Sequence, residues 1–354
     1  MTIADVYNKL GEKLKVPPSS YIPEVISKLV TPEDAEMLLE LPATPKELAE
    51  KLKTNEDTAK RKLDEFVRKG LAFAFIKEGQ LRYFFARSVA QLHDATSAAV
   101  FNNLDWPSRE EVLELWERNR QRNVELVREL GQPPGAPGNR FRVIPLRAAV
   151  KDDTGMLPFE DTEAILRNAP DIAVVNCPCR MYQVIHGLND KPLEVCMQLT
   201  AGSAKYAHEQ GIGRTLTLEE GLGILRLAEE AGLVPSVFGG ESLGFICHCD
   251  GQGCGGLRVG VQTGYFNVDK SRYESVVDPQ LCNGCQACVE RCIFDAIGMV
   301  KVPGSKKLKA SVDPEKCYGC GACVIKCPVE GAMALKLVRP KEHIPTMEMT
   351  HLQV

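Results

Sequence analysis

The most constraining feature of the chain is a cysteine pattern that occurs twice near its C-terminal end. In each copy, three cysteines follow one another at intervals of three residues, and a fourth lies four residues beyond the third. The second copy begins 35 residues after the first. The cysteines are Cys282, Cys285, Cys288 and Cys292 in the first copy and Cys317, Cys320, Cys323 and Cys327 in the second. This C-x2-C-x2-C-x3-C spacing is typical of thiolate ligands to [4Fe-4S] clusters.

The spacing also predicts how the thiolates are shared between two clusters. Three cysteines of a run lie in one tight loop, whereas the fourth is carried away on the following helix and reaches the other cluster. Gly284 and Gly319 suit such loops, because a side chain there would crowd the inorganic core. We therefore expect cluster 1 to bind Cys282, Cys285, Cys288 and Cys327, and cluster 2 to bind Cys317, Cys320, Cys323 and Cys292.

The alternative for this region is a pair of structural zinc sites. Zinc knuckles favour paired C-x2-C units with a longer spacer, and a triple run that occurs twice does not match them. The region from about 276 to 338 resembles the bacterial dicluster ferredoxins, with Ile293 in place of the proline that would follow Cys292. The resemblance implies two [4Fe-4S] clusters that transfer electrons.

Length and charge limit the remaining choices. A chain of 354 residues indicates two or three domains. A formal net charge of -4 does not favour general affinity for nucleic acid. No apolar run approaches the roughly 20 residues that span a bilayer, and residues 1–5 do not resemble a secretion signal. We therefore expect a cytoplasmic protein without membrane contact, and the fourteen cysteines fit a reducing compartment and an anaerobic host.

Residues 1–90 follow a pattern of helices and then a hairpin, and they resemble winged-helix domains. In that family the third helix enters the major groove of DNA. Basic and acidic residues nearly balance in this region, so we favour a docking or dimerisation role over binding of nucleic acid. Dimerisation through this region would make the protein a homodimer. The expected elements are helices that begin at Thr31, Thr44 and about Asn55, a helix end at Gly70, and strands at 71–76 and 81–85.

The rest of the chain divides by composition into four regions. Residues 91–138 are expected to form a helical connector that ends in a Pro- and Gly-rich linker. Residues 139–265 alternate strand and helix signals, which predicts an α/β or α+β domain. Residues 266–338 form the ferredoxin-like domain, and 339–354 a tail. Together these regions predict an α+β multidomain protein. Within the 139–265 domain we expect strands at 141–146, 172–175 and 243–246, a helix at 159–168, and another after the capping box at Thr217.

A second group of cysteines lies in the 139–265 domain, close to the expected strand ends. Two C-x-C pairs there could face each other and bind an iron–sulfur cluster or zinc. Arg180 could neutralise thiolate charge, and the Gly-rich loop 251–256 could surround the site with backbone amides. A third [4Fe-4S] cluster, zinc and a thiol–disulfide pair all stay open, as does the role of His248. The cysteines are Cys177, Cys179, Cys196, Cys247, Cys249 and Cys254.

The functional expectation is electron transfer. The order of the regions resembles a loosely described group of iron–sulfur proteins from anaerobes, which implies such a role. We expect an electron-transfer subunit of a larger oxidoreductase whose partner is a redox protein or a catalytic subunit. The alternatives are a reductase with its catalytic site at the middle cysteines and a redox-sensing winged-helix transcription regulator. The lysines between the two motifs either form a solvated hairpin or steer an acidic partner; they are Lys301, Lys306, Lys307 and Lys309.

Overall fold

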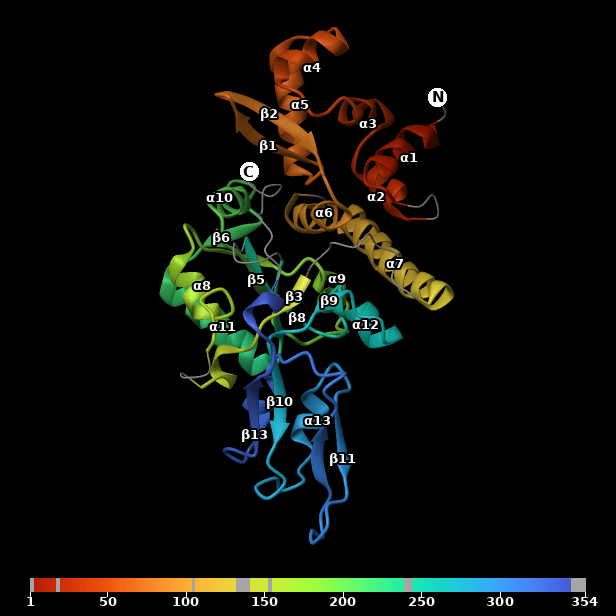
Figure 1. Ribbon diagram of the computed structural model, residues 1–354. Helices are drawn as coiled ribbons and strands as arrows, with labels where there is room; N and C mark the ends of the chain where they lie inside the picture. Colours follow the sequence, from red (N-terminus) through yellow and green to blue (C-terminus); the bar gives the residue numbers. More distant parts are fainter. Residues whose placement is uncertain are drawn as a thin grey trace.

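The computed structural model describes residues 3–16, 20–103, 106–131, 141–151, 155–238 and 244–344. Most of the expected linker, the tail beyond 344 and the start of the strand expected at 243–246 lie outside these ranges. Three parts follow one another along the molecule, namely N-terminal helices with a hairpin, a central sheet, and the cysteine-rich C-terminal part (Figure 1). Within the described ranges, no helix has the length and apolarity needed to cross a membrane.

The N-terminal part consists of helices and one hairpin. Side-chain oxygens of Thr31, Thr44 and Asn55 cap the three helices that we expected to begin there. The two strands pair antiparallel, which confirms the expected hairpin. The relationship to winged-helix domains stays a prediction. The elements are α1 (Ile3–Lys13), α2 (Ile22–Leu29), α3 (Pro32–Leu39), α4 (Pro45–Leu52), α5 (Glu56–Arg68), β1 (Ala72–Lys77) and β2 (Gln80–Phe85).

The central part is a mixed sheet covered by helices. In the described residues its seven strands have the order β6-β4-β5-β8-β7-β3-β9. Neighbouring strands are antiparallel except β3 and β9, so the observed arrangement is the α+β alternative and not a parallel α/β sheet. The elements are β3 (Phe141–Val143), α8 (Thr162–Asn168), β4 (Ala173–Asn176), α9 (Met181–Ile185), β5 (Glu194–Gln198), α10 (Ala201–Glu209), β6 (Gly213–Thr215), α11 (Leu218–Ala231), β7 (Val234–Phe238), β8 (Phe245–Cys249), α12 (Leu257–Thr263) and β9 (Val268–Asp269).

Several elements of the central part begin or end at other residues than the sequence predicts. The capping box at Thr217 is present and starts α11. The helix expected at 159–168 begins later, because the side chain of Asp161 caps it. Strand β9 belongs to the central sheet although it lies beyond residue 265. The central and C-terminal parts therefore overlap in sequence at the expected boundary.

Two long helices, α6 (Val89–Asn103) and α7 (Trp106–Leu130), follow the hairpin. We expected them to form a separate connector, yet Trp116 belongs to the same apolar core as the N-terminal helices. Across to the central part, the Tyr206 hydroxyl of α10 donates a hydrogen bond to the Val67 carbonyl at 3.2 Å. The N-terminal part thus packs directly on the central part.

The C-terminal part contains two copies of a strand-helix-strand unit. Each copy pairs its strands with the other copy, since β10 pairs with β13 and β11 with β12, both antiparallel. The two helices lie 35 residues apart, as the cysteine motifs do. The sequence repeat is therefore a structural repeat. The elements are β10 (Tyr273–Val277), α13 (Ala287–Arg291), β11 (Ile297–Val300), β12 (Lys309–Val312), α14 (Ala322–Lys326) and β13 (Met333–Leu337).

Candidate metal centres

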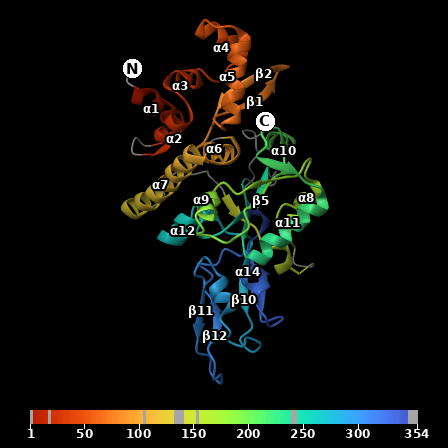
Figure 2. The same ribbon diagram turned by 180° about the vertical axis from the view of Figure 1, so that it is seen from behind.

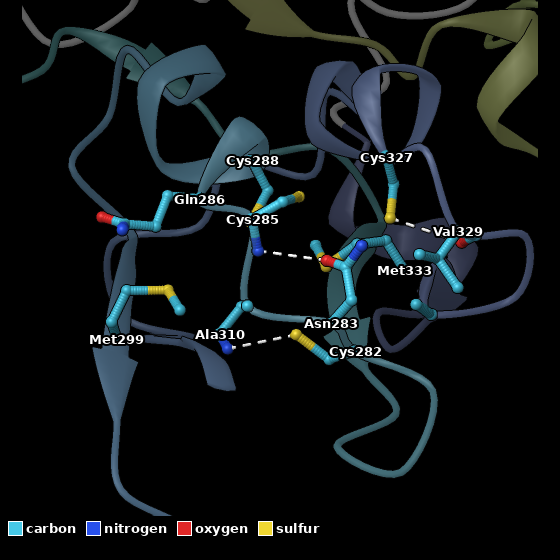
Figure 3. A pocket seen from close by; sticks show the side chains of 12 residues that line it. Cys282, Asn283, Cys285, Gln286, Cys288, Met299, Ala310, Cys327, Val329 and Met333 are labelled. Carbon is cyan, nitrogen blue, oxygen red and sulfur yellow. Dashed lines mark hydrogen bonds between the residues drawn. The ribbon is translucent and has the colours of Figure 1, made fainter. Parts of the chain in front are cut away.

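One cavity in the C-terminal part is lined by the four cysteines that we assigned to cluster 1. Cys282, Cys285 and Cys288 come from the first motif, and Cys327 comes from the second (Figure 3). The empty volume is about 330 Å³, part of which is open to solvent. The backbone N–H of Ala310 donates to the Cys282 sulfur at 3.5 Å. The donor set and its mixed origin fit a [4Fe-4S] cluster.

A second cavity contains the four cysteines that we assigned to cluster 2. Its thiols come from Cys317, Cys320 and Cys323 of the second motif and from Cys292 of the first. The empty volume is about 300 Å³. The backbone N–H of Ser275 donates to the Cys317 sulfur at 3.4 Å. This cavity repeats the arrangement of the first, so each motif contributes its fourth cysteine to the cavity that the other motif forms.

The two cavities differ in one hydrogen-bond donor. Ala310 on β12 and Ser275 on β10 occupy matching positions in the repeat, and each backbone N–H donates to a cysteine sulfur. Ser275 also places its hydroxyl oxygen 3.1 Å from the Cys323 sulfur, whereas alanine has no such group. Hydrogen bonds to the sulfurs help to set the reduction potential of a bound cluster. The repeat therefore creates two sites with different electrostatics.

The cavities also differ in their contact with solvent. Cys285 in the first cavity is exposed, whereas Cys317 and Cys323 in the second are buried. Burial raises the pKa of the Cys323 thiol to about 12. Such a thiol keeps its proton at neutral pH unless a metal replaces it. The first cavity thus has an exposed cysteine that another molecule can reach, whereas the four cysteines of the second are buried or half-buried.

Gly284 and Gly319 have the left-handed backbone that favours glycine, with φ of +76° and +68°. A β-carbon on Gly284 would overlap the carbonyl oxygen of Leu308, and one on Gly319 would overlap that of Tyr273. Tyr273 begins β10 and Leu308 directly precedes β12, so both overlaps occur at the start of a strand of the other copy and at matching positions in the repeat. The need for glycine therefore also follows from strand packing, which the sequence alone did not reveal.

The four lysines between the motifs do not behave alike. Lys301, Lys306 and Lys307 are exposed in and beside the β11–β12 turn. Lys309 is half-buried, and its ammonium donates to the carbonyl oxygen of Cys282. We therefore assign Lys309 to holding the loop of the first cavity, and we reserve the name exposed lysines for the other three.

The sheet order brings the cysteines of the central part together. Strands β4 and β8 lie on either side of β5 and both run antiparallel to it, so their carboxyl ends point the same way. One C-x-C pair follows β4, the other ends β8, and Cys196 lies on β5 between them. We call the set the six-cysteine group, comprising Cys177, Cys179, Cys196, Cys247, Cys249 and Cys254.

The thiols of this group are close enough to influence one another. Hydrogen bonding to Cys196 and Cys249 raises the pKa of the Cys247 thiol, whereas the bond from Cys247 lowers that of Cys249. Burial raises the pKa of Cys177, and it raises that of Cys179 to about 12. Thiols in mutual contact and shielded from water form a donor set suited to a soft metal or an iron–sulfur cluster.

Arg180 ties the two ends of the group together. Its guanidinium donates to the Asp250 carboxylate at 2.6 Å and to the His248 carbonyl at 2.8 Å. We expected the positive charge of Arg180 to balance thiolates, but the Asp250 carboxylate also balances it. The His248 ring is buried, and its Nδ1 lies 2.7 Å from the Val195 carbonyl, so Nδ1 carries the hydrogen and this bond orients the ring. In the Gly-rich loop the N–H groups of Gln252 and Gly253 donate to the Asp250 carboxylate. The Leu257 N–H, directly after the loop, donates to the Cys254 sulfur at 3.5 Å.

Sequence reasoning missed the residues that cover this group from α6. Ligand atoms of His93, Asp94 and Cys179 lie within 4.8 Å of one another. His93 Nε2 is 2.8 Å from the Arg120 guanidinium, which can only donate, so Nδ1 carries the hydrogen and donates to Asp94 at 2.7 Å. Both ring nitrogens are thus engaged, and we regard these residues as a cover and not as a metal site. No local motif marks them, because the contact depends on how α6 packs.

The same guanidinium belongs to an ion-pair network that joins α7 to α12. Glu117 accepts hydrogen bonds from Arg120, at 2.8 Å, and from Arg258. Burial alone would raise the pKa of Glu117, but the two arginines hold it below its ordinary value. The carboxylate therefore stays charged between the N-terminal and central parts.

Comparison with known proteins supports the C-terminal assignment. A model of the 4Fe-4S dicluster domain family matches residues 281–331, a range that contains both cysteine motifs. An uncharacterised ABC transporter ATP-binding protein of Methanocaldococcus jannaschii is 38% identical over 50 residues, which cover 14% of this chain and 8% of that protein. The chain thus spans less than a tenth of the length of this relative. The C-terminal part is an iron–sulfur region similar to dicluster ferredoxins, and the family model covers residues 281–331 of the chain.

Proposed function

We propose that the protein is an electron-transfer subunit of a larger oxidoreductase, with one [4Fe-4S] cluster in each C-terminal cavity. The proposal is supported above all by the grouping of the eight cysteines into two cavities, each with three thiols from one motif and one from the other. Bound clusters of this type take up and release single electrons. The ligands would be Cys282, Cys285, Cys288 and Cys327 for cluster 1, and Cys317, Cys320, Cys323 and Cys292 for cluster 2.

The surroundings of the first cavity favour it as the contact with a partner. Cys285 is exposed there, and the exposed lysines lie on the neighbouring turn. A positive patch next to a redox site attracts an acidic partner and accelerates its approach, and salt weakens the effect. The partner would be an acidic redox protein or catalytic subunit.

The regulator alternative finds little support in the charges of α5. Lys60 pairs with Asp64 at 2.6 Å, and Lys62 pairs with Asp34 at 3.0 Å. A helix that binds the phosphate backbone needs cations available for that contact. We therefore keep docking or dimerisation as the role of the N-terminal part, and a homodimer stays a prediction.

The six-cysteine group extends the proposal to a third site, which would hold an iron–sulfur cluster or zinc. Its buried or half-buried thiols and the amide donor at Leu257 suit either. Because the group lies inside the fold beneath α6, it also keeps open the alternative of a reductase with its chemistry there.

The experiment that tests the main proposal is anaerobic preparation of the full chain, followed by iron and sulfide analysis and electron paramagnetic resonance. We expect about four irons for each C-terminal cavity and a signal that appears on reduction with dithionite. A double variant, Cys285→Ala with Cys288→Ala, should lose cluster 1 and leave cluster 2 in place. Colourless protein with zinc in the C-terminal part would contradict the proposal.

A further inference from the structure

The second cavity and the six-cysteine group share one continuous apolar cluster. Cys249 and Cys254 from the six-cysteine group pack in it together with Cys317 from the second cavity. Cys247 and Cys292 lie against the same cluster. Two thiol sites from separate parts of the sequence are therefore joined by packed side chains.

The cysteine loops of the two sites lie next to each other. Gly251 lies in the loop between Cys249 and Cys254, and a β-carbon built on it would be 3.6 Å from the Cβ of Ile293. Ile293 directly follows Cys292, a predicted ligand of cluster 2. The contact thus connects a cysteine loop of one site with a cysteine loop of the other.

Three aromatic rings extend this contact. Phe294 and Tyr318 line the second cavity and stack with centroids 4.4 Å apart and an interplanar angle of 18°. Phe266 packs on both, at 5.4 Å from Phe294 and 4.9 Å from Tyr318. On its other side the Phe266 ring fills the space above Gly260 of α12, the helix that follows Cys254. The rings thus run from the wall of the second cavity to the helix beside the six-cysteine group.

We propose that the six-cysteine group holds a third iron–sulfur cluster, which exchanges electrons with cluster 2 across this contact. The inference rests on the proposed function, because it needs a reduced cluster 2 as the source. One electron leaves cluster 2, which is oxidised, and enters the third cluster, which is reduced; no proton or bond is exchanged. Zinc is redox-inactive and would make the aromatic connection irrelevant to electron flow. The partner at the first cavity supplies or accepts the electron.

The first test measures metal content and magnetic coupling in the full chain prepared anaerobically. We expect about twelve irons per chain in the wild type and about eight in the Cys249→Ser, Cys254→Ser double variant. The reduced wild type should show a signal broadened by coupling between neighbouring clusters, and the variant should lose part of it. About eight irons with one zinc in the wild type would overturn the third cluster but leave the proposed function intact. Absence of iron would overturn both.

The second test measures the rate of electron transfer through the aromatic rings, in variants that keep every cysteine ligand. In Phe266→Leu we expect the iron content of the wild type and slower reduction of the third cluster after rapid mixing with a protein donor. Tyr265→Leu is the matched control, because Tyr265 is adjacent in sequence but 45% exposed, and it should keep the wild-type rate. An unchanged rate in Phe266→Leu would overturn the assignment of the path to these rings.

Discussion

The hydroxyl of Ser275 provides a direct test of how the two C-terminal sites are made different. It lies 3.1 Å from the Cys323 sulfur, and the matching residue in the repeat is Ala310. Hydrogen bonding by Ser275 favours the thiolate form of Cys323. When a cluster gains an electron its sulfurs become more negative, so the same bond stabilises the reduced state more than the oxidised state. Ser275→Ala should therefore lower the reduction potential of cluster 2.

The size of the shift follows from the strength of one hydrogen bond. A bond of this kind contributes about 0.5–1.5 kcal/mol net. In a one-electron couple, a tenfold change in the equilibrium constant, or about 1.4 kcal/mol, corresponds to about 59 mV. If most of the bond strength depends on the added charge, the potential falls by about 20–60 mV. The backbone N–H that donates to Cys317 is unaffected by the substitution.

The assay is a redox titration of the full chain followed by electron paramagnetic resonance. The reciprocal variant Ala310→Ser adds a hydroxyl at the first site and should raise the potential of cluster 1 by a similar amount. The two variants together identify which wave belongs to which cluster. If Ser275→Ala leaves both potentials in place, or moves the wave that Ala310→Ser moves, the hydrogen bond does not distinguish the sites.

Three further changes test other contacts. Gly319→Ala should cost about 1–2 kcal/mol from its left-handed backbone alone, and the overlap with Tyr273 should lower iron occupancy at the second cavity; Gly298→Ala, with open space around it, should not. Replacing the exposed lysines by glutamate should slow association with an acidic redox partner about tenfold at low salt, and equal rates in stopped-flow mixing would count against a docking role. The lowered pKa of Glu117 means that its stabilising charge is present above the ordinary carboxyl pKa and is lost as pH falls through the lowered value. Glu117→Gln should therefore cost about 3 kcal/mol at pH 7 and flatten the acid side of a plot of Tm against pH.

The cysteine motifs made the C-terminal part predictable because metal ligation fixes both residue type and spacing over a short stretch. The same spacing led to the exchange of Cys292 and Cys327 between motifs, and the two cavities contain these residues as assigned. The helix caps at Thr31 and Thr44 were predictable for a similar reason, since a cap depends on neighbours three residues away.

The remaining features depend on contacts between distant segments. The order of β4, β5 and β8 decides that the six cysteines meet, and a single sequence does not reveal strand order. Ser275 lies before the first cysteine motif but contacts Cys323 of the second. This contact depends on the pairing of β10 with β13, which local sequence does not reveal. The cover of His93 and Asp94 depends on the packing of α6. The pairing of β9 with β3, a strand far earlier in the chain, likewise leaves no local signal near residue 265.

The pairing of β9 with β3 has a mechanical consequence for the C-terminal part. The chain leaves the central sheet at Asp269 and enters β10 at Tyr273, so the connection between the central and C-terminal parts is short. Arg291 donates to the carbonyls of Glu229 and Glu230 at the end of α11, and α14 lies next to the same helix (Figure 2). Because these contacts attach the C-terminal part to α11, we do not expect it to move as a domain on a flexible linker does. If the two cavities bind clusters as proposed, these contacts keep the clusters at a fixed place relative to the central part, and a redox partner has to reach them there.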